Sequence, residues 1–244
     1  MKPILLVTQP THIDFPLFRY NVGRFKDYFS GIWIALSNHH QGVDYTNFFM
    51  AQMPYANFVD VKHTGMDWRN DAINETLDQI KTNEPICFME QDFLIKDESF
   101  FEKVFKDEYP FIYFTEGERV HPAFAVVSRD YIEQTFKDFS AYPETYGDHF
   151  AKFFQELPST GIYLEELGVK NKIDYYHLNG LTQNYHNFKN DSPFYNQDIF
   201  LAYNYLCRYL PIDNHPQFFQ IERMITEKYG KGDGEGFIKN FFPQ

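Results

Sequence analysis

Short apolar runs separated by polar stretches recur along this chain. In one of them, four apolar residues at 86–89 follow Pro85, and two carboxylates, Glu90 and Asp92, come directly after the run. A continuous apolar run of this length predicts a strand that is buried on both faces, as in a parallel sheet covered by helices. Similar runs predict further strands at 4–7, 32–36, 58–61, 111–114, 121–127 and 173–182.

Apolar residues at spacings of three and four predict helices between these strands. Ala72, Ile73, Leu77 and Ile80 form one face of an amphipathic helix that follows the strand at 58–61. Other helices are expected at 18–29, 100–105, 128–136, 148–157, 162–168, 198–210 and 217–229. The pattern therefore predicts an α/β fold, with a mostly parallel sheet flanked by helices.

The acidic pair after the strand at 86–89 is the first candidate for chemistry. Residues i and i+2 share one side of an extended chain, so Glu90 and Asp92 can face the same point. In open α/β sheets, ligands bind at the carboxyl ends of the strands. A divalent cation and the pyrophosphate of a nucleotide would suit two carboxylates there. The same pattern also fits a solvated strand end that carries two acids by chance.

Two further polar segments follow predicted strands. Thr8 and Gln9 lie in the loop after the first strand, where they could hold a nucleobase or ribose or form a plain turn. Arg69 and Asn70 fall in the first turn of the amphipathic helix. An arginine there opposes the helix dipole, but its planar fork suits a carboxylate or phosphate. A solvated surface charge is the alternative interpretation of Arg69.

Composition and charge narrow the class of protein. The chain has 244 residues, 43% of them hydrophobic, which indicates a folded globule, and we expect a first domain at 1–185 and an aromatic-rich helical extension at 186–244. A formal charge of −12 argues against nucleic acid and anionic membranes as partners.

Two cysteines, Cys87 and Cys207, give no disulfide framework, so a reduced, cytoplasmic protein is expected. We expect no signal peptide and no membrane span, because the apolar runs are too short.

The order of these features resembles that of a GT-A glycosyltransferase and is most similar to the family 2 type, from about residue 4 to residue 182. In that family an Arg-Asn pair lies beside the nucleotide, which implies this role for Arg69 and Asn70. The family's Asp-X-Asp motif binds a metal through the nucleotide diphosphate. The matching segment here is Glu90, Gln91 and Asp92, so the first acid departs from the pattern.

The resemblance also implies a catalytic base and a further metal ligand. Family members often carry an acid that opens a helix and accepts the proton of the acceptor hydroxyl. Asp148 is the best match, although a glycine precedes it where the family usually has a glutamate. Glu165 and Glu166 are the reserve candidates for the base, and His177 matches the position of a metal-binding histidine. An ordinary helix cap at Asp148 and a simple turn histidine at 177 are the alternatives.

The resemblance therefore implies a metal-dependent glycosyltransferase. It would use Mn²⁺ or Mg²⁺ to move a hexosyl group from a nucleoside diphosphate sugar to an acceptor hydroxyl, with inversion. A nucleotidyltransferase on a similar sheet is less favoured, because the loop after the first strand lacks the Gly-rich, basic composition that such enzymes usually show. A non-catalytic sugar- or nucleotide-binding protein of GT-A type is the other alternative. The glutamate at position 90 and the glycine before Asp148 favour it.

Overall fold

The computed structural model describes residues 2–8, 15–36, 46–61, 68–116, 119–135, 161–171 and 173–177, together with single residues at 190, 223 and 227. The chain divides into two compact units. Unit 1 comprises residues 1–9, 25–90 and 101–169, and unit 2 comprises residues 10–24, 91–100 and 170–244.

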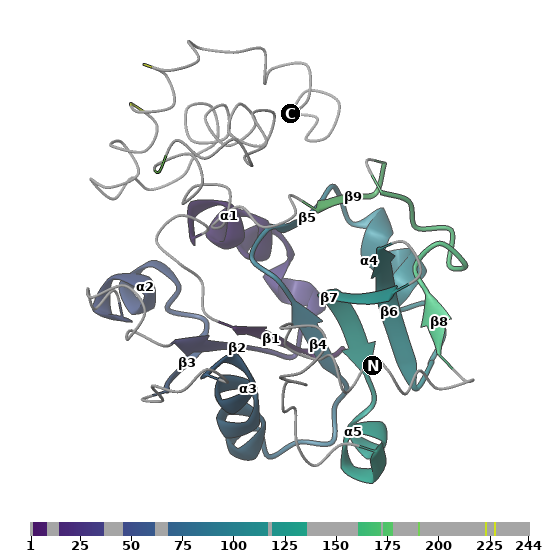
Figure 1. Ribbon diagram of the computed structural model, residues 1–244, viewed down its shortest axis with the longest axis horizontal. Coiled ribbons are helices and arrows are strands. Elements are labelled where there is room, and N and C mark those ends of the chain that lie inside the picture. The colour runs from purple at the N-terminus through teal and green to yellow at the C-terminus, as the bar shows by residue number, and fades with distance from the viewer. Residues whose placement is uncertain are drawn as a thin grey trace. The chain divides into compact units, whose positions relative to one another are not determined.

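Unit 1 is built on a seven-stranded sheet with the order β3-β2-β1-β4-β7-β6-β8 (Figure 1). Its strands are β1 (Ile4–Thr8), β2 (Gly31–Leu36), β3 (Asn57–Asp60), β4 (Ile86–Met89), β6 (Phe111–Glu116), β7 (Arg119–Val127) and β8 (Ile162–Tyr163). Neighbouring strands are parallel except that β7 runs antiparallel to both β4 and β6. The predicted α/β, Rossmann-like fold with a mostly parallel sheet is confirmed.

The strand order reverses between β1 and β4. The chain runs outward from β1 through β2 to β3, then returns to place β4 on the other side of β1, where Leu6 pairs with Phe88. Such a reversal is the topological switch point at which open α/β sheets bind their ligands, beside the carboxyl ends of the strands. The segment that leaves β4 therefore begins at the position where this fold binds ligands.

Two helices cover one face of this sheet (Figure 1). Helix α3 (Trp68–Gln79) contributes Ile73 and Leu77 to a core cluster, and helix α5 (Arg129–Thr135) contributes Ile132. Residues of β1, β4, β6 and β7 complete the cluster: Ile4, Leu6, Ile86, Phe88, Phe111, Tyr113, Ala125 and Val127. The alternate residues Leu5 and Val7 are also fully buried, which matches a strand covered on both faces. Ser128 caps α5, since the Tyr131 N–H donates to its Oγ at 3.2 Å.

Unit 2 contains a second, smaller sheet. Strands β5 (Phe93–Ile95) and β9 (Tyr175–His177) pair antiparallel, with Phe93 opposite His177. The ring of Phe93 stacks on that of Tyr175 at a centroid distance of 4.7 Å, and Phe100 meets Tyr175 edge-on. Most of helix α1 (Phe15–Phe25) belongs to the same unit.

The remaining described elements are α2 (Thr46–Gln52), the short 3-10 helix η1 (Lys26–Tyr28) and α4 (Ser99–Val104). The sequence pattern did not predict α2 or β5, because each is too short to show a clear period. No helix in the described part of the chain is long and apolar enough to cross a membrane. The predicted domain boundary after residue 185, and the helices expected at 148–157 and 198–210, lie outside the described residues.

One local prediction was wrong. The expected helix at 162–168 is instead strand β8 followed by a single turn. That turn ends in a Schellman motif, in which Gly168 has a φ of 73° and the N–H of Val169 donates to the carbonyl of Leu164. One turn is too short for a stable helix of its own, and Ile162 instead pairs with Ile112 of β6.

Candidate metal centre

The segment after β4 carries the predicted acidic pair. Glu90 directly follows β4, and its N–H donates to the Ala123 carbonyl of β7 at 3.0 Å, so its backbone is still fixed by the neighbouring strand. Gln91 and Asp92 form a turn that leads directly into β5. The expectation that the strand ends immediately before Glu90 is confirmed.

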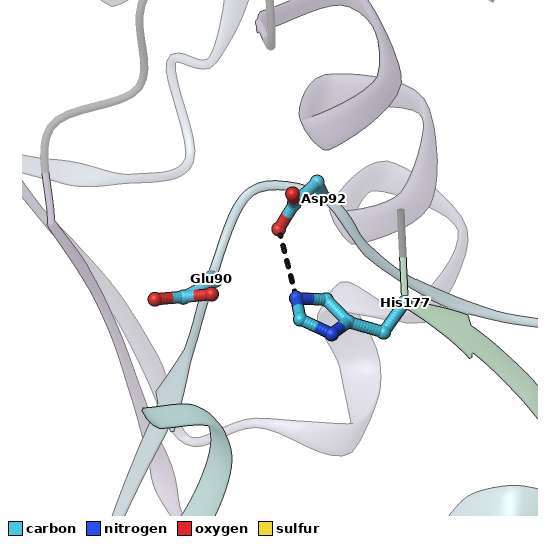
Figure 2. A group of neighbouring side chains, drawn as sticks. All are labelled: Glu90, Asp92 and His177. Atoms are coloured by element: carbon cyan, nitrogen blue, oxygen red, sulfur yellow. Dashed lines mark ion pairs between the residues drawn. The ribbon is translucent and has the colours of Figure 1, made fainter. Parts of the chain in front are cut away.

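His177 reaches this segment through the pairing of β5 with β9. Since Phe93 stands opposite His177 in that pair, the residue before Phe93 is a neighbour of the histidine. His177 Nε2 lies 3.6 Å from Asp92 Oδ1, and the two side chains point toward one another in Figure 2. Both are enclosed, with side-chain exposures of 3% for His177 and 9% for Asp92.

The trio of Glu90, Asp92 and His177 has the donor chemistry of a divalent metal site. Each residue offers one ligand atom, and these atoms all lie within 4.8 Å of one another. Carboxylate oxygens suit Mg²⁺ and Mn²⁺, and an imidazole nitrogen adds a softer donor. A carboxylate in so enclosed a place is costly unless it is paired or coordinates a metal.

The distances between the ligand atoms of Glu90, Asp92 and His177 agree with binding of one metal ion. Two ligand atoms that each lie about 2.1 Å from one ion are separated by at most about 4.2 Å. The 3.6 Å between His177 and Asp92 satisfies that limit, and a trio spanning up to 4.8 Å meets it after a small side-chain rotation. The described residues therefore fit a hard divalent cation.

The other predicted site residues fall in three groups. Thr8 ends β1, and Arg69 and Asn70 lie in the first turn of α3, but the structure describes only the backbone at these positions. Gln9 and Asp148 lie outside the described residues. Glu165 is exposed in the turn after β8, which is separated from β4 by β7 and β6. Their roles remain predictions.

Sequence reasoning missed a buried polar residue close to the site. Asn21, on α1, is 1% exposed and hydrogen-bonds the backbone of β5. A signal was present, because Asn21 sits among the apolar residues Phe18, Val22 and Phe25 that mark the buried face of the predicted helix. A polar residue on such a face needs an internal hydrogen-bond partner.

Comparisons with known proteins give similarity of fold without a family. No protein-family model matches this chain, and no curated protein matches it. Among solved structures it is similar to TarS 1–349 from S. aureus, with 11% identity, 99% of this chain and 81% of that chain covered, and a TM-score of 0.49. It is also similar to the glycosyltransferase GlyE from Streptococcus pneumoniae TIGR4, with 10% identity, coverage of 100% and 65%, and a TM-score of 0.47.

A third similar structure is a putative glucose-1-phosphate thymidylyltransferase from Bacillus anthracis in complex with a sucrose. Its identity to this chain is 11%, the coverage is 67% of this chain and 85% of that chain, and the TM-score is 0.41. At these levels of identity and structural similarity the chain is not assigned to a family.

Proposed function

We propose that this chain is a metal-dependent glycosyltransferase of GT-A type, which moves a hexosyl group from a nucleoside diphosphate sugar to an acceptor hydroxyl. The observation that carries the proposal is the enclosed pair of Asp92 and His177, directly after β4. Ligand atoms of two carboxylates and an imidazole lie within 4.8 Å of one another, and one of these residues, Glu90, directly follows β4 at the switch point of the sheet. That combination suits a cation bound together with a pyrophosphate.

In this proposal Asp92, His177 and Glu90 hold Mn²⁺ or Mg²⁺. When bound, such a cation supplies Lewis-acid stabilisation of the negative charge that develops on a departing diphosphate. Arg69 is the proposed donor of N–H hydrogen bonds to a phosphate oxygen, and Asn70 and Gln91 are the other proposed contacts to the nucleotide. Thr8, which ends β1, and Gln9, the next residue in the sequence, are the proposed contacts to the nucleobase or ribose.

Transfer then needs a base on the acceptor side, and Asp148 is the proposed group. Asp148 accepts the proton of the acceptor hydroxyl while that oxygen forms a bond to the anomeric carbon. The bond from this carbon to the diphosphate oxygen breaks in the same step, which inverts the configuration and releases the nucleoside diphosphate. A positioned base contributes about 10²–10⁴-fold in rate.

Glu165 is the second candidate for the base. Neighbouring strands lie about 4.8 Å apart, so three strand spacings separate β8 from β4 by about 14 Å. Glu165 follows β8, whereas Glu90 follows β4. This separation counts against Glu165, which is kept in reserve, and Asp148 is preferred because it best matches the family's position for the base.

The proposal is tested by release of nucleoside diphosphate from UDP-, GDP-, CDP- and dTDP-sugars, with and without Mn²⁺. One donor is expected to turn over with the metal, and Asp92→Asn is expected to lower the rate on the order of 10²-fold or more, since metal stabilisation is worth several kcal/mol. Asp174→Asn is the matched control, because Asp174 has the same 6% exposure in the same unit and accepts a backbone hydrogen bond from Lys170.

A non-catalytic sugar- or nucleotide-binding protein is the second candidate. The observation that favours it is Glu90, whose longer side chain stands where the family motif has aspartate. Metal-dependent binding of a nucleotide sugar without any release of nucleoside diphosphate, in the presence of candidate acceptors, would favour this alternative over the transferase.

A further inference from the structure

Strand β5 directly follows Asp92 and pairs with the strand that contains His177, yet it is only three residues long. Among the described strands it pairs with β9 alone. Backbone groups alternate between the two edges of a strand. The Lys96 N–H, just past β5, donates to the Asp174 carbonyl on the β9 side at 3.0 Å. Phe93 and Ile95 therefore present their backbone groups to the opposite edge of β5.

Asn21 of α1 takes the place of a strand at that edge. Its Nδ2 donates to the Phe93 carbonyl at 2.9 Å, and its Oδ1 accepts from the Ile95 N–H at 3.0 Å. One side-chain amide thus satisfies a carbonyl and an N–H two residues apart, as a neighbouring strand would. Asn21 is 1% exposed, so water does not readily replace these bonds, and each buried group left unsatisfied costs about 1–3 kcal/mol.

The two Asn21 hydrogen bonds fix the register of β5 against its neighbours, in addition to satisfying buried backbone groups. The stacking of Phe93 on Tyr175 holds the strands together, but apolar contact is non-directional and tolerates sliding. A slip of one residue would move β5 by about 3.3 Å and turn its side chains to the other face. The two Asn21 bonds fix Phe93 and Ile95 at defined points, which opposes such a slip.

Asp92 directly precedes Phe93, and His177 stands opposite Phe93. Asn21 therefore bonds the carbonyl oxygen of Phe93, the residue that is bonded to Asp92 in the chain and paired with His177 across the strands. One turn further along α1, Arg24 Nη2 donates to the Lys96 carbonyl at 2.6 Å and secures the other end of β5.

We propose that Asn21 is a positioning residue for the metal centre, with Arg24 as its auxiliary at the far end of β5. The inference rests on the proposed metal site, and it does not require that the protein transfer a sugar. Helix α1 sets the register of β5, and the register of β5 sets the separation of Asp92 from His177.

The test measures Mn²⁺ affinity by isothermal titration calorimetry, without nucleotide, on the full chain. Asn21→Leu removes both side-chain bonds at similar volume and is expected to weaken Mn²⁺ binding about tenfold or more, as loss of an outer-shell partner does. Arg24→Ala changes an exposed residue, so its effect on folding is small, and it is expected to weaken binding about threefold.

Thr76→Val is the matched control for general destabilisation. Thr76 is fully buried in α3, where its Oγ1 donates to the Ala72 carbonyl, and it belongs to the other unit. This variant is expected to lower the melting temperature while leaving the Mn²⁺ dissociation constant of the wild type unchanged. A structural role for Asn21 alone would give the same result as Thr76→Val.

The outcomes separate the two claims. A folded Asn21→Leu protein whose Mn²⁺ dissociation constant equals that of the wild type overturns the positioning role. If Asn21→Leu does not fold, the Arg24→Ala variant provides the test. A Mn²⁺ dissociation constant of Arg24→Ala equal to that of the wild type then overturns the positioning role. Absence of Mn²⁺ binding by the wild type would overturn the metal site itself and the inference with it. Loss of affinity in both variants, with none in Thr76→Val, supports the proposal even where no sugar transfer is found.

Discussion

His177 Nε2 lies 3.6 Å from Asp92 Oδ1, although the two residues belong to distant parts of the sequence. The contact follows from the pairing of β5 with β9, which sets Phe93 opposite His177. The pairing of two three-residue strands thus brings Asp92, which directly precedes β5, next to His177, and Glu90 completes the carboxylate–imidazole group (Figure 2).

Substitution of His177 by glutamine should change the choice of metal. An imidazole nitrogen favours Mn²⁺ relative to Mg²⁺, because Mg²⁺ prefers oxygen ligands and keeps its waters. The wild type is expected to bind Mn²⁺ more tightly than Mg²⁺, and His177→Gln is expected to lose about tenfold in Mn²⁺ affinity and less in Mg²⁺ affinity. Calorimetric titration with each ion measures the two constants. Equal losses for both ions would argue against His177 as a ligand.

The two halves of this site differ in how far the sequence predicts them. The run at 86–89 and the acids after it are contiguous, so period and length alone predict the strand, its end and the position of Glu90 and Asp92. The position of His177 depends on a long-range pairing of two three-residue strands. Strands of that length show no measurable period, and resemblance to a family, not hydrophobic pattern, selected the histidine.

Replacement of Gly168 by alanine should destabilise unit 1. Gly168 has a φ of 73°, in the left-handed region, where a Cβ costs about 1–2 kcal/mol. A Cβ there would meet no atom within 4 Å, so the cost is conformational and not steric. Gly168→Ala is expected to lower the free energy of unfolding by about 1 kcal/mol in urea titrations.

Gly31→Ala is the control for that measurement. Gly31 opens β2, and a Cβ there would lie no closer than 3.7 Å to the Trp33 side chain. Its substitution is expected to change the free energy of unfolding by less than about 0.5 kcal/mol. Equal effects of the two alanines would contradict the assignment of the left-handed turn.

The wrong prediction at 162–168 has the same physical origin as the missed strand β5, since each is a short strand that pairs with a partner distant in sequence. The local apolar spacing fits one helical turn there, but Ile162 pairs with Ile112 of β6 at the edge of the sheet. The sheet partner, β6, is distant in sequence, so tertiary pairing overrides the local pattern. By contrast, α3 follows its predicted apolar face closely, because Ile73 and Leu77 enter the core through local periodicity alone.

Glu166 should control the ionisation of two tyrosines at the edge of the sheet. A hydrogen bond to Glu166 and its negative charge raise the pKa of Tyr163, and burial followed by the same charge raises the pKa of Tyr113. The stability linked to these raised pKa values is present below the ordinary tyrosine pKa of about 10 and is lost as the pH rises through the raised values.

Glu166→Gln is therefore expected to move tyrosine ionisation to lower pH, as measured by the ultraviolet absorbance of tyrosinate in difference titrations against the wild type. Glu165→Gln is the control, because Glu165 is the smallest of the influences that raise the pKa of Tyr163. A shift from Glu165→Gln as large as that from Glu166→Gln would contradict the hydrogen bond between Tyr163 and Glu166.

Cys87 should be inert while the sheet is intact. It lies in β4 with no exposed surface, and burial raises the pKa of its thiol, so the reactive thiolate is not formed near neutral pH. In a Cys207→Ser background, iodoacetamide is expected to label the protein only at denaturant concentrations that unfold unit 1. Rapid labelling under native conditions would contradict the buried position of β4.

In the proposed function, Asp92 and His177 hold a divalent cation together with a nucleoside diphosphate. Its most direct test is calorimetric binding of UDP, GDP, CDP and dTDP, with and without Mn²⁺, to the wild type, Asp92→Asn and Asp174→Asn. One diphosphate is expected to bind the wild type and Asp174→Asn about tenfold more tightly with Mn²⁺, and Asp92→Asn is expected to lose this gain. Binding that is equal with and without Mn²⁺, or a Mn²⁺ gain that survives in folded Asp92→Asn, would contradict it.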